Sequence, residues 1–223
     1  MKIFIQHWKL LPSAWLLVVQ MCILIMTFFP ISHHLYRVIT WGLGVLALLL
    51  IARVIRETIV FKWLGRFFIV GAIFCLLLMM FGLDDVYLQV AAHGFEIGAY
   101  LCATYGLVRY MFADRYSTKD ELFAAAAAFT LLAWAFAYAY STCQLLVPNS
   151  FVNTVHPGPE QSWLDILFFS FSLQTATGLS NLLPAQPLVK IISILQMFIG
   201  VMYLAMIVSR LIALQYVSKS PRL

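Results

Sequence analysis

Long apolar runs alternate with short polar or charged stretches along the whole chain, and this pattern predicts a bundle of membrane-spanning helices. A bilayer core about 30 Å thick needs roughly 20 apolar residues in each spanning helix. The predicted spans cover about residues 14–29, 38–52, 67–83, 86–110, 122–146 and 188–214. We therefore predict an all-α membrane protein with six transmembrane helices.

One apolar run, within Trp163–Asn181, is too short to cross a bilayer. It reads WLDILFFSFSLQTATGLSN, which predicts a helix of about a dozen residues, roughly 18 Å long, followed by a Thr/Gly/Ser loop. Ser162 before the run and Asp165 three residues later form a helix-capping pattern. Non-helical backbone at that depth is tolerated only where it is buried in protein or lines water. The segment therefore predicts a re-entrant pore helix and filter loop between the fifth and sixth spans.

The positions of the basic residues support the same arrangement. Of the 14 lysines and arginines, only Arg37 and Lys190 lie outside if the N-terminus is cytoplasmic and the spans alternate. A full crossing at residues 163–181 would move Lys219 and Arg222 to the outside. We therefore predict that this segment enters and leaves by the outer face and that both termini are cytoplasmic.

Composition places the chain in a membrane and excludes several other classes. Apolar residues make up 63% and charged residues 10% of the chain, whereas a soluble domain carries roughly a quarter charged residues. The net charge is +5, but the basic residues lie between spans instead of forming a stripe, so nucleic acid is not an expected partner. The sequence shows no Ser/His/Asp set, phosphate loop or metal-ligand cluster. We therefore expect neither an enzyme nor a cofactor or metal site.

Two runs near the end of the chain carry motifs in a specific order: FSFSLQTATGLSNLLPAQPL and then ILQMFIGVMYLAMIVSRLIAL. They resemble the pore module of the tetrameric potassium-channel superfamily, particularly small bacterial ion channels, over about residues 162–214. The usual run there is F-S-F-x-T-x-T-T-V-G-Y-G-D, two prolines three apart, then I-L-E, G-x-x-Y-L-A and A-R-L. The matching residues are Phe169, Ser170, Phe171, Thr175, Gly178, Pro184, Pro187, Leu188, Ile194, Leu195, Gly200, Tyr203, Leu204, Ala205, Arg210 and Leu211.

The resemblance implies a homotetrameric ion channel in the bacterial inner membrane, with lipid and monovalent cations as partners. A permeant K⁺ or Na⁺ would bind in the filter. It also implies a four-helix transmembrane domain at residues 1–116 and a pore domain at residues 117–223. A voltage-sensing helix needs several arginines in the membrane field, each worth about 2.3 kcal/mol per 100 mV. The fourth span has no basic residue before Arg109, so we expect little voltage dependence.

The loop that aligns with the family's selectivity filter is divergent. Most of its differences from the family's filter sequence lie in its outer half. Its residues are Thr175, Ala176, Thr177, Gly178, Leu179, Ser180 and Asn181. Ser180 replaces the second glycine, where positive φ would cost about 1–2 kcal/mol, or roughly 4–8 kcal/mol in a tetramer. Asn181 replaces the aspartate and removes an outer negative charge from each subunit. We hypothesise that the outer half is remodelled and that cation permeation is weakly potassium-selective or non-selective.

Three further positions have two interpretations each. Glu96 lies inside the fourth span, where a central charge costs roughly 2.5–3.5 kcal/mol, and His93 lies one turn away on the same face. The pair is a candidate proton or ligand sensor; alternatively Glu96 is a neutral carboxyl bonded to a tyrosine such as Tyr87 or Tyr100. Gly200 is either a gating hinge or a close-packing site.

The rival to a channel is a non-conducting membrane sensor or scaffold that retains the same architecture. In that protein the re-entrant hairpin would be sealed, and Gly178 would only allow a turn. A secondary transporter would show internal repeats with paired broken helices, whereas the sequence shows one break and no second copy.

Overall fold

A computed structural model describes residues 12–26, 59–82, 85–113, 119–155, 158 and 160–219 of the chain. The predicted span at residues 38–52 lies outside the described residues. The elements are α2 (Pro12–Met26), α4 (Ile59–Met80), α5 (Val86–Ala113), α6 (Lys119–Leu146), β1 (Phe151–Asn153), α7 (Trp163–Gln174), β2 (Leu182–Pro184) and α8 (Pro187–Lys219). The described chain is therefore mostly helical.

The described helices fall on the predicted apolar runs. Their length and apolar composition are those of an integral membrane protein. Among the described residues, Trp63–Met80, Asp120–Leu146 and Pro187–Arg210 are long and apolar enough to cross a membrane. The apolar part of α2, Ser13–Met26, is shorter, and the 28-residue α5 is not among the three because polar side chains interrupt it. A total of six spans stays a prediction.

The boundary of α4 differs from the prediction. The basic stretch before residue 67 was expected to be a connection between spans. Instead α4 begins at Ile59, so that Lys62 and Arg66 lie on the helix itself. Both residues therefore precede the main apolar part of α4 in the sequence of the helix.

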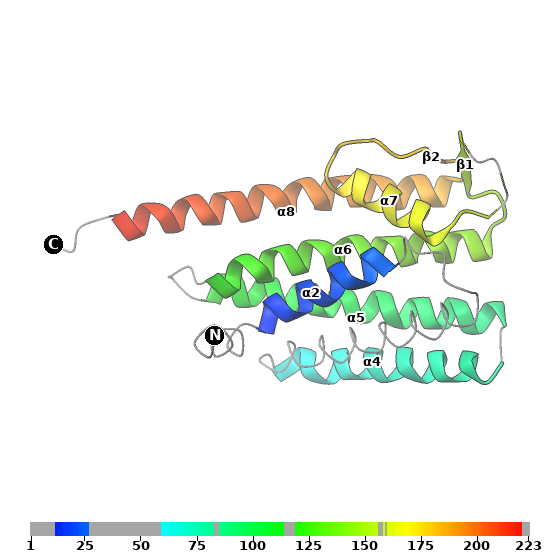
Figure 1. The fold of residues 1–223 in the computed structure, drawn as a ribbon, viewed down its shortest axis with the longest axis horizontal. Coiled ribbons are helices and arrows are strands. Elements are labelled where there is room, and N and C mark those ends of the chain that lie inside the picture. Colours follow the sequence, from blue (N-terminus) through cyan, green and yellow to red (C-terminus); the bar gives the residue numbers. More distant parts are fainter. Residues whose placement is uncertain are drawn as a thin grey trace.

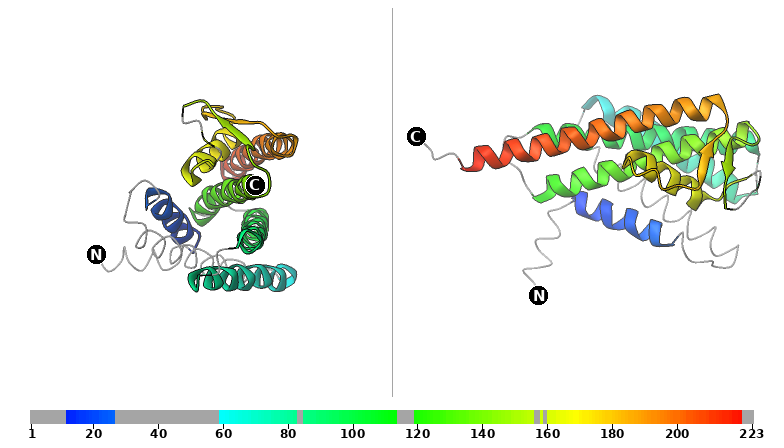
Figure 2. Two further views of the ribbon diagram at one scale, coloured as in Figure 1. Left: turned by 90° about the vertical axis from the view of Figure 1, so that its right-hand side faces the viewer. Right: turned by 90° about the horizontal axis from the view of Figure 1, so that it is seen from above.

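Helix α6 is the centre of the bundle (Figure 1). It packs against α5 and α2 on one side and against α7 and α8 on the other, while α4 packs on α5. The end view shows α6 between the α4–α5 layer and the α7–α8 pair (Figure 2). The short α7 lies beside the first half of the much longer α8 (Figure 1).

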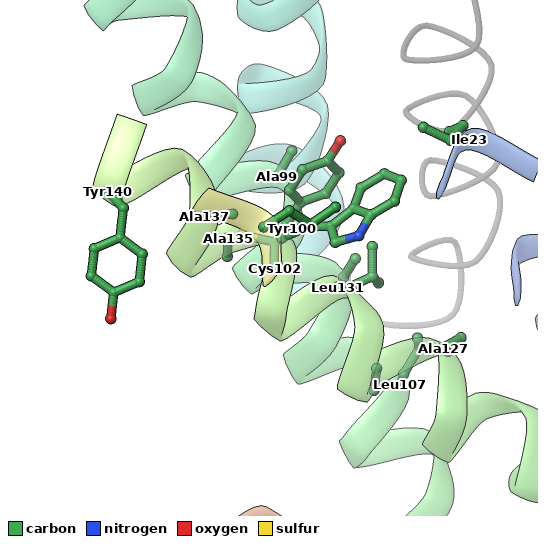
Figure 3. Close-up of a cluster of buried hydrophobic side chains, with 14 of the residues drawn as sticks. Ile23, Ala99, Tyr100, Cys102, Leu107, Ala127, Leu131, Ala135, Ala137 and Tyr140 are labelled. Carbon is green, nitrogen blue, oxygen red and sulfur yellow. The ribbon is translucent and has the colours of Figure 1, made fainter. Parts of the chain in front are cut away.

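Small residues allow α4, α5 and α6 to approach closely. A Cβ added to Gly71 would lie 2.5 Å from the Phe95 ring, and one added to Gly98 would lie 2.5 Å from the Phe68 ring. Between α5 and α6 the buried face is mostly alanine, with the larger Tyr100 and Leu131 filling the gaps (Figure 3). Close backbone approach through small residues is a common way to join helices in lipid, because lipid itself is apolar.

A two-stranded antiparallel sheet joins the loop after α6 to the loop after α7, and the sequence analysis predicted no strand there. Phe151 pairs with Pro184, Val152 with Leu183 and Asn153 with Leu182. Strands of only three residues, one of them ending in Pro184, carry too little alternation to be recognised in a sequence. The sheet fixes the end of the segment that follows α7.

Candidate functional site

The start of α7 is capped by side chains. The Ser162 hydroxyl accepts a hydrogen bond from the Asp165 backbone N–H at 3.1 Å and donates one to Asp165 Oδ2 at 2.7 Å. Ser162 has extended backbone geometry, as an N-cap residue should. The Trp163 ring lies 4.6 Å from the Tyr138 ring, which anchors the first turn on α6.

Helix α7 ends in a Schellman motif built on an alanine. The Thr177 N–H donates to Ser172 O at 3.0 Å, and the Ala176 N–H donates to Leu173 O at 3.1 Å. Ala176 has φ of 57°, in the left-handed position where glycine or asparagine is usual. The motif therefore stores backbone strain of about 1–2 kcal/mol at one residue.

This motif uses the last carbonyls of α7 internally. Ser172 O also accepts the Gly178 N–H at 3.3 Å and the Thr177 hydroxyl at 3.3 Å. The Thr175 hydroxyl donates to Phe171 O at 2.8 Å and lies 3.1 Å from the Thr177 hydroxyl. The last carbonyls of α7, which carry the negative pole of the helix dipole, are thus hydrogen-bonded to the loop's own N–H groups and hydroxyls.

The loop itself projects from buried surroundings. The residues before it, Ser172–Gln174, are buried, whereas residues 175–179 are exposed and Leu179 is 70% exposed. Gly178 has φ of 65°, so left-handed residues alternate with others at positions 176 and 178.

The backbone at Ser180 does not have the positive φ that the sequence analysis considered for this position. Among the described residues, the positive-φ positions other than glycine are Asn149 and Ala176, so the strain lies at Ala176 and not at Ser180. The Ser180 hydroxyl accepts the Leu182 N–H at 3.1 Å in a local turn. Asn181 O accepts the Thr154 N–H at 3.1 Å and the Thr154 hydroxyl at 3.3 Å. These bonds lead the loop into β2.

A set of amide side chains ties the entry of α7 to the end of α6. Gln161 N donates to Gln144 Oε1 at 2.8 Å, and Gln144 Nε2 donates to Gln161 O at 3.2 Å. Asn153 Nδ2 donates to Gln161 Oε1 at 2.9 Å. Because Asn153 belongs to β1, the same amides also fix the sheet. Strand β1 is therefore bonded to the chain on both sides of α7: to Gln161 before the helix, and to β2 after the loop.

A second polar network lies buried behind the last turns of α7. Gln196 of α8 is fully buried and donates to Ser170 Oγ at 2.7 Å and to Ser170 O at 3.0 Å. Its carbonyl accepts the Tyr140 hydroxyl at 2.8 Å. Ser170 Oγ donates to Ala133 O at 2.7 Å, and Gln174 Nε2 donates to Phe129 O at 2.7 Å. The network joins α6, α7 and α8, and sequence reasoning did not find it.

Gly200 packs directly against the end of α7. A Cβ added there would lie 2.6 Å from Gln174 O and 2.9 Å from Gln174 Cα. Backbone atoms at that distance leave no room for a side chain. The packing interpretation of Gly200 thus has a physical basis, and the gating hinge stays a prediction.

Glu96 is buried in an aromatic cluster, with an exposure of 5%. Its carboxyl forms a hydrogen bond with Tyr138 of α6, which also bonds to Tyr100. The His93 ring lies 5.2 Å from the Tyr138 ring. The sequence analysis named Tyr87 and Tyr100 as partners, yet Tyr87 is 78% exposed. It missed Tyr138 because that residue lies on another helix.

The C-terminal part of α8 is held by an ion pair. Arg210 Nη2 lies 3.4 Å from Glu121 Oε2, and the Arg210 guanidinium stacks over the Phe112 ring at 4.8 Å from its centroid. Above it, the Tyr203 hydroxyl donates to Ala125 O at 2.7 Å. Among the described residues, no group of three His, Cys, Asp or Glu side chains is arranged to hold a metal ion.

Comparison with known proteins gives one match. Residues 126–215 match the family model described as an ion channel. The matched stretch begins within α6 and runs through β1, α7, the loop and β2 into α8. No curated protein and no solved structure matches the chain.

Proposed function

We propose that residues 126–215, which match an ion-channel family model, form a pore module of the potassium-channel superfamily, and that four copies of the chain assemble around a passive cation pore. One chain supplies one pore loop, so a closed ring of loops requires several chains. The exposed apolar residues of α8 support this, because they offer partner subunits and lipid a long apolar face. They include Ile191, Ile194, Phe198, Val201 and Val208.

The membrane arrangement we propose has six spans with α7 re-entering from the outer face. Support comes from the 12-residue length of α7, too short for a crossing, and from the distribution of basic residues. Both termini then lie in the cytoplasm, and the four-helix part at residues 1–116 precedes the pore part at residues 117–223. The bacterial inner membrane is the proposed location.

The proposed filter consists of Thr175, Ala176, Thr177, Gly178, Leu179, Ser180 and Asn181. The observation that carries the proposal is the exposed, alternating loop at the end of a capped short helix. Carbonyls and threonine hydroxyls of residues 175–178 would bind K⁺ or Na⁺. Discrimination between the two is weak, since the outer half turns away into β2 after Ser180.

Gating is proposed to depend little on voltage. In α5, Val86–Ala113, the single lysine or arginine is Arg109, near the inner end of the helix. Glu96 and His93 are proposed instead as a sensing pair, because Tyr138 is hydrogen-bonded to Glu96, packs near the His93 ring and contacts Trp163 at the start of α7. Gly200, pressed against Gln174, is where an inner-helix movement would reach the filter.

Reconstitution into liposomes tests the proposal. We expect the protein to pass K⁺ and Na⁺ down a gradient, with a permeability ratio within about tenfold of unity. The variant Gly178→Val should abolish flux, because a branched side chain cannot adopt positive φ without strain and would crowd the ring of loops. Gly82→Val is the matched control, since Gly82 also has positive φ and no atom within 4 Å, but lies outside the pore module.

Each other outcome decides against part of the proposal. A strong preference for K⁺ in recordings with K⁺ and Na⁺ on opposite sides would contradict the weak selectivity. Absence of flux from the unaltered protein at any pH, voltage or membrane tension would instead support the non-conducting sensor or scaffold.

A further inference from the structure

We propose that Gln196 of α8 positions the last turn of α7, and that through this turn it sets the geometry of the loop that discriminates between cations. The inference rests on the proposed channel function where it concerns ions. Its structural part, the positioning of the loop, stands independently of conduction.

The contacts of Gln196 require an amide. Its nitrogen donates to Ser170 Oγ at 2.7 Å, to Ser170 O at 3.0 Å and to Gln174 Oε1 at 3.3 Å. Its oxygen accepts the Tyr140 hydroxyl at 2.8 Å. A side chain at this position must therefore donate and accept at once, and a buried polar group left without a partner is costly.

The residues held by Gln196 lie immediately before the loop. Ser170 and Gln174 flank Ser172, whose carbonyl accepts the N–H groups of Thr177 and Gly178. A displacement of this turn would move Ser172 O and with it the part of the loop that is bonded to it. Gln174 is also the residue against which Gly200 packs, one turn further along α8 from Gln196.

Gln196 therefore connects α8 to the last turns of α7, which precede the loop, through directional hydrogen bonds. Tyr140 completes the connection on the α6 side, pointing away from the α5–α6 core (Figure 3). An apolar side chain of the same length would fill the space but would leave Ser170 O, Gln174 Oε1 and the Tyr140 hydroxyl without this partner. The helix ends would then be free to shift relative to one another.

Ser193 provides a matched control on the same helix. It is 2% exposed, similar to Gln196, and its hydroxyl donates to Val189 O of its own helix at 2.8 Å. Its contact with the Tyr140 hydroxyl is long, at 3.5 Å. Ser193→Ala therefore removes a buried polar group near Gln196 without detaching α8 from α7.

The experiment compares Gln196→Met, Gln196→Glu and Ser193→Ala in the full chain, reconstituted in lipid. Hydrogen exchange of the backbone amides of residues 175–178 reports loop position, and reversal potentials under K⁺ and Na⁺ report selectivity. We expect Gln196→Met to speed exchange at least about tenfold and to change the permeability ratio at least about twofold. A tenfold change corresponds to about 1.4 kcal/mol. Ser193→Ala should change neither.

Gln196→Glu separates positioning from simple packing. A protonated glutamic acid can donate to Ser170, whereas the ionised form can only accept. Among the described contacts of residue 196, the titratable side chain is that of Tyr140. We expect exchange and permeability in this variant to approach those of the unaltered protein at low pH and to depart from them as pH rises. Gln196→Met should show no such dependence.

Two results would overturn the inference: loop exchange in Gln196→Met equal to that in Ser193→Ala, or a Gln196→Glu variant without pH dependence. If the unaltered protein passes no ions, the proposed function fails, and the exchange data alone then decide whether Gln196 positions the loop. Size-exclusion chromatography of each variant shows whether assembly is retained.

Discussion

Buried polar groups are treated differently in the two halves of the bundle. Around α7 several of them bridge helices, as in the bonds that Gln196, Ser170 and Gln174 make to α6, α7 and α8. On the α2–α5–α6 side, Ser13 with Asp120 and Glu96 with Tyr138 also join helices, but several other buried polar atoms have no hydrogen-bond partner among the described residues. These atoms are Gln20 Oε1, His93 Nδ1, Thr104 Oγ1 and Trp134 Nε1.

The difference shows where the fold demands a fixed geometry. Hydrogen bonds constrain direction as well as distance, so a network that joins three helices fixes their relative position. Alanine and glycine contacts, such as those between α4 and α5 or between α5 and α6, constrain the distance between helices far more than their register. The first half can therefore shift at a smaller cost than the half that holds the loop.

Glycine substitutions should test this contrast with the largest effect. Gly200→Ala places a Cβ against the backbone of Gln174, which cannot give way as a flexible side chain can. We expect a loss of about 3 kcal/mol per subunit, at the upper end for overpacking, together with loss of flux. Thermal unfolding in detergent and liposome flux are the measurements.

Gly106→Ala is the control for that substitution in the other half. Gly106 lies within α5, and nothing lies within 4 Å of an added Cβ. Stability should change by less than about 1 kcal/mol, in the stabilising direction that helix propensity gives. Equal losses in the two variants would show that the contrast between the halves is wrong.

Removal of single hydroxyl groups should have opposite effects in the two halves. Tyr140→Phe deprives Gln196 Oε1 of its donor in the buried network, and we expect a loss of about 2 kcal/mol. Thr104→Val removes a buried hydroxyl that has no partner among the described residues, and we expect a gain of about 1 kcal/mol. Thermal unfolding of the two variants, at the same protein concentration, measures both.

If Thr104→Val is as destabilising as Tyr140→Phe, the Thr104 hydroxyl has a partner, and the α5–α6 contact is fixed by polar bonds as well. If Tyr140→Phe is neutral, the network around Gln196 does not hold the helices. Either result would remove the distinction between a bonded half and a packed half.

The sequence predicted the helices well because each carries its own signal. The apolar runs located α5, α6 and α8, and the capped short run located α7 at Trp163–Gln174. Local signals suffice there, since helix caps and apolar length act within a few residues. The recognition of the pore module had the same origin, and residues 126–215 match the ion-channel family.

Features that depend on contacts between distant residues could not be predicted. The partner of Glu96 is Tyr138, on another helix, and the network of Gln196 joins residues as far apart as Tyr140 and Gln196. Arg210 of α8 likewise lies 3.4 Å from Glu121 at the start of α6, a pairing of residues far apart in the sequence. Spacing along one helix does not reveal which neighbour a side chain meets.

The strain at Ala176 shows the same limit within a local motif. The sequence analysis assigned the positive φ to Ser180 because it aligned the loop with a filter containing two glycines. The structure ends α7 with a Schellman turn, which places the left-handed residue directly after Thr175. Alanine gave no signal for this geometry, since it is a helix former and not a usual left-handed residue.

Ala176→Gly should therefore stabilise the protein by about 1 kcal/mol per subunit, because glycine adopts positive φ without strain. Asn149→Gly is the control: Asn149 also has positive φ, at 56°, but asparagine tolerates it, so the gain should be smaller. Thermal unfolding of both variants measures the difference. A larger gain for Asn149→Gly, or a loss for Ala176→Gly, would show that the strain is not at Ala176. The expected gain is small, and it tests whether the hydrogen bonds around α7 hold the loop in place despite backbone strain at Ala176.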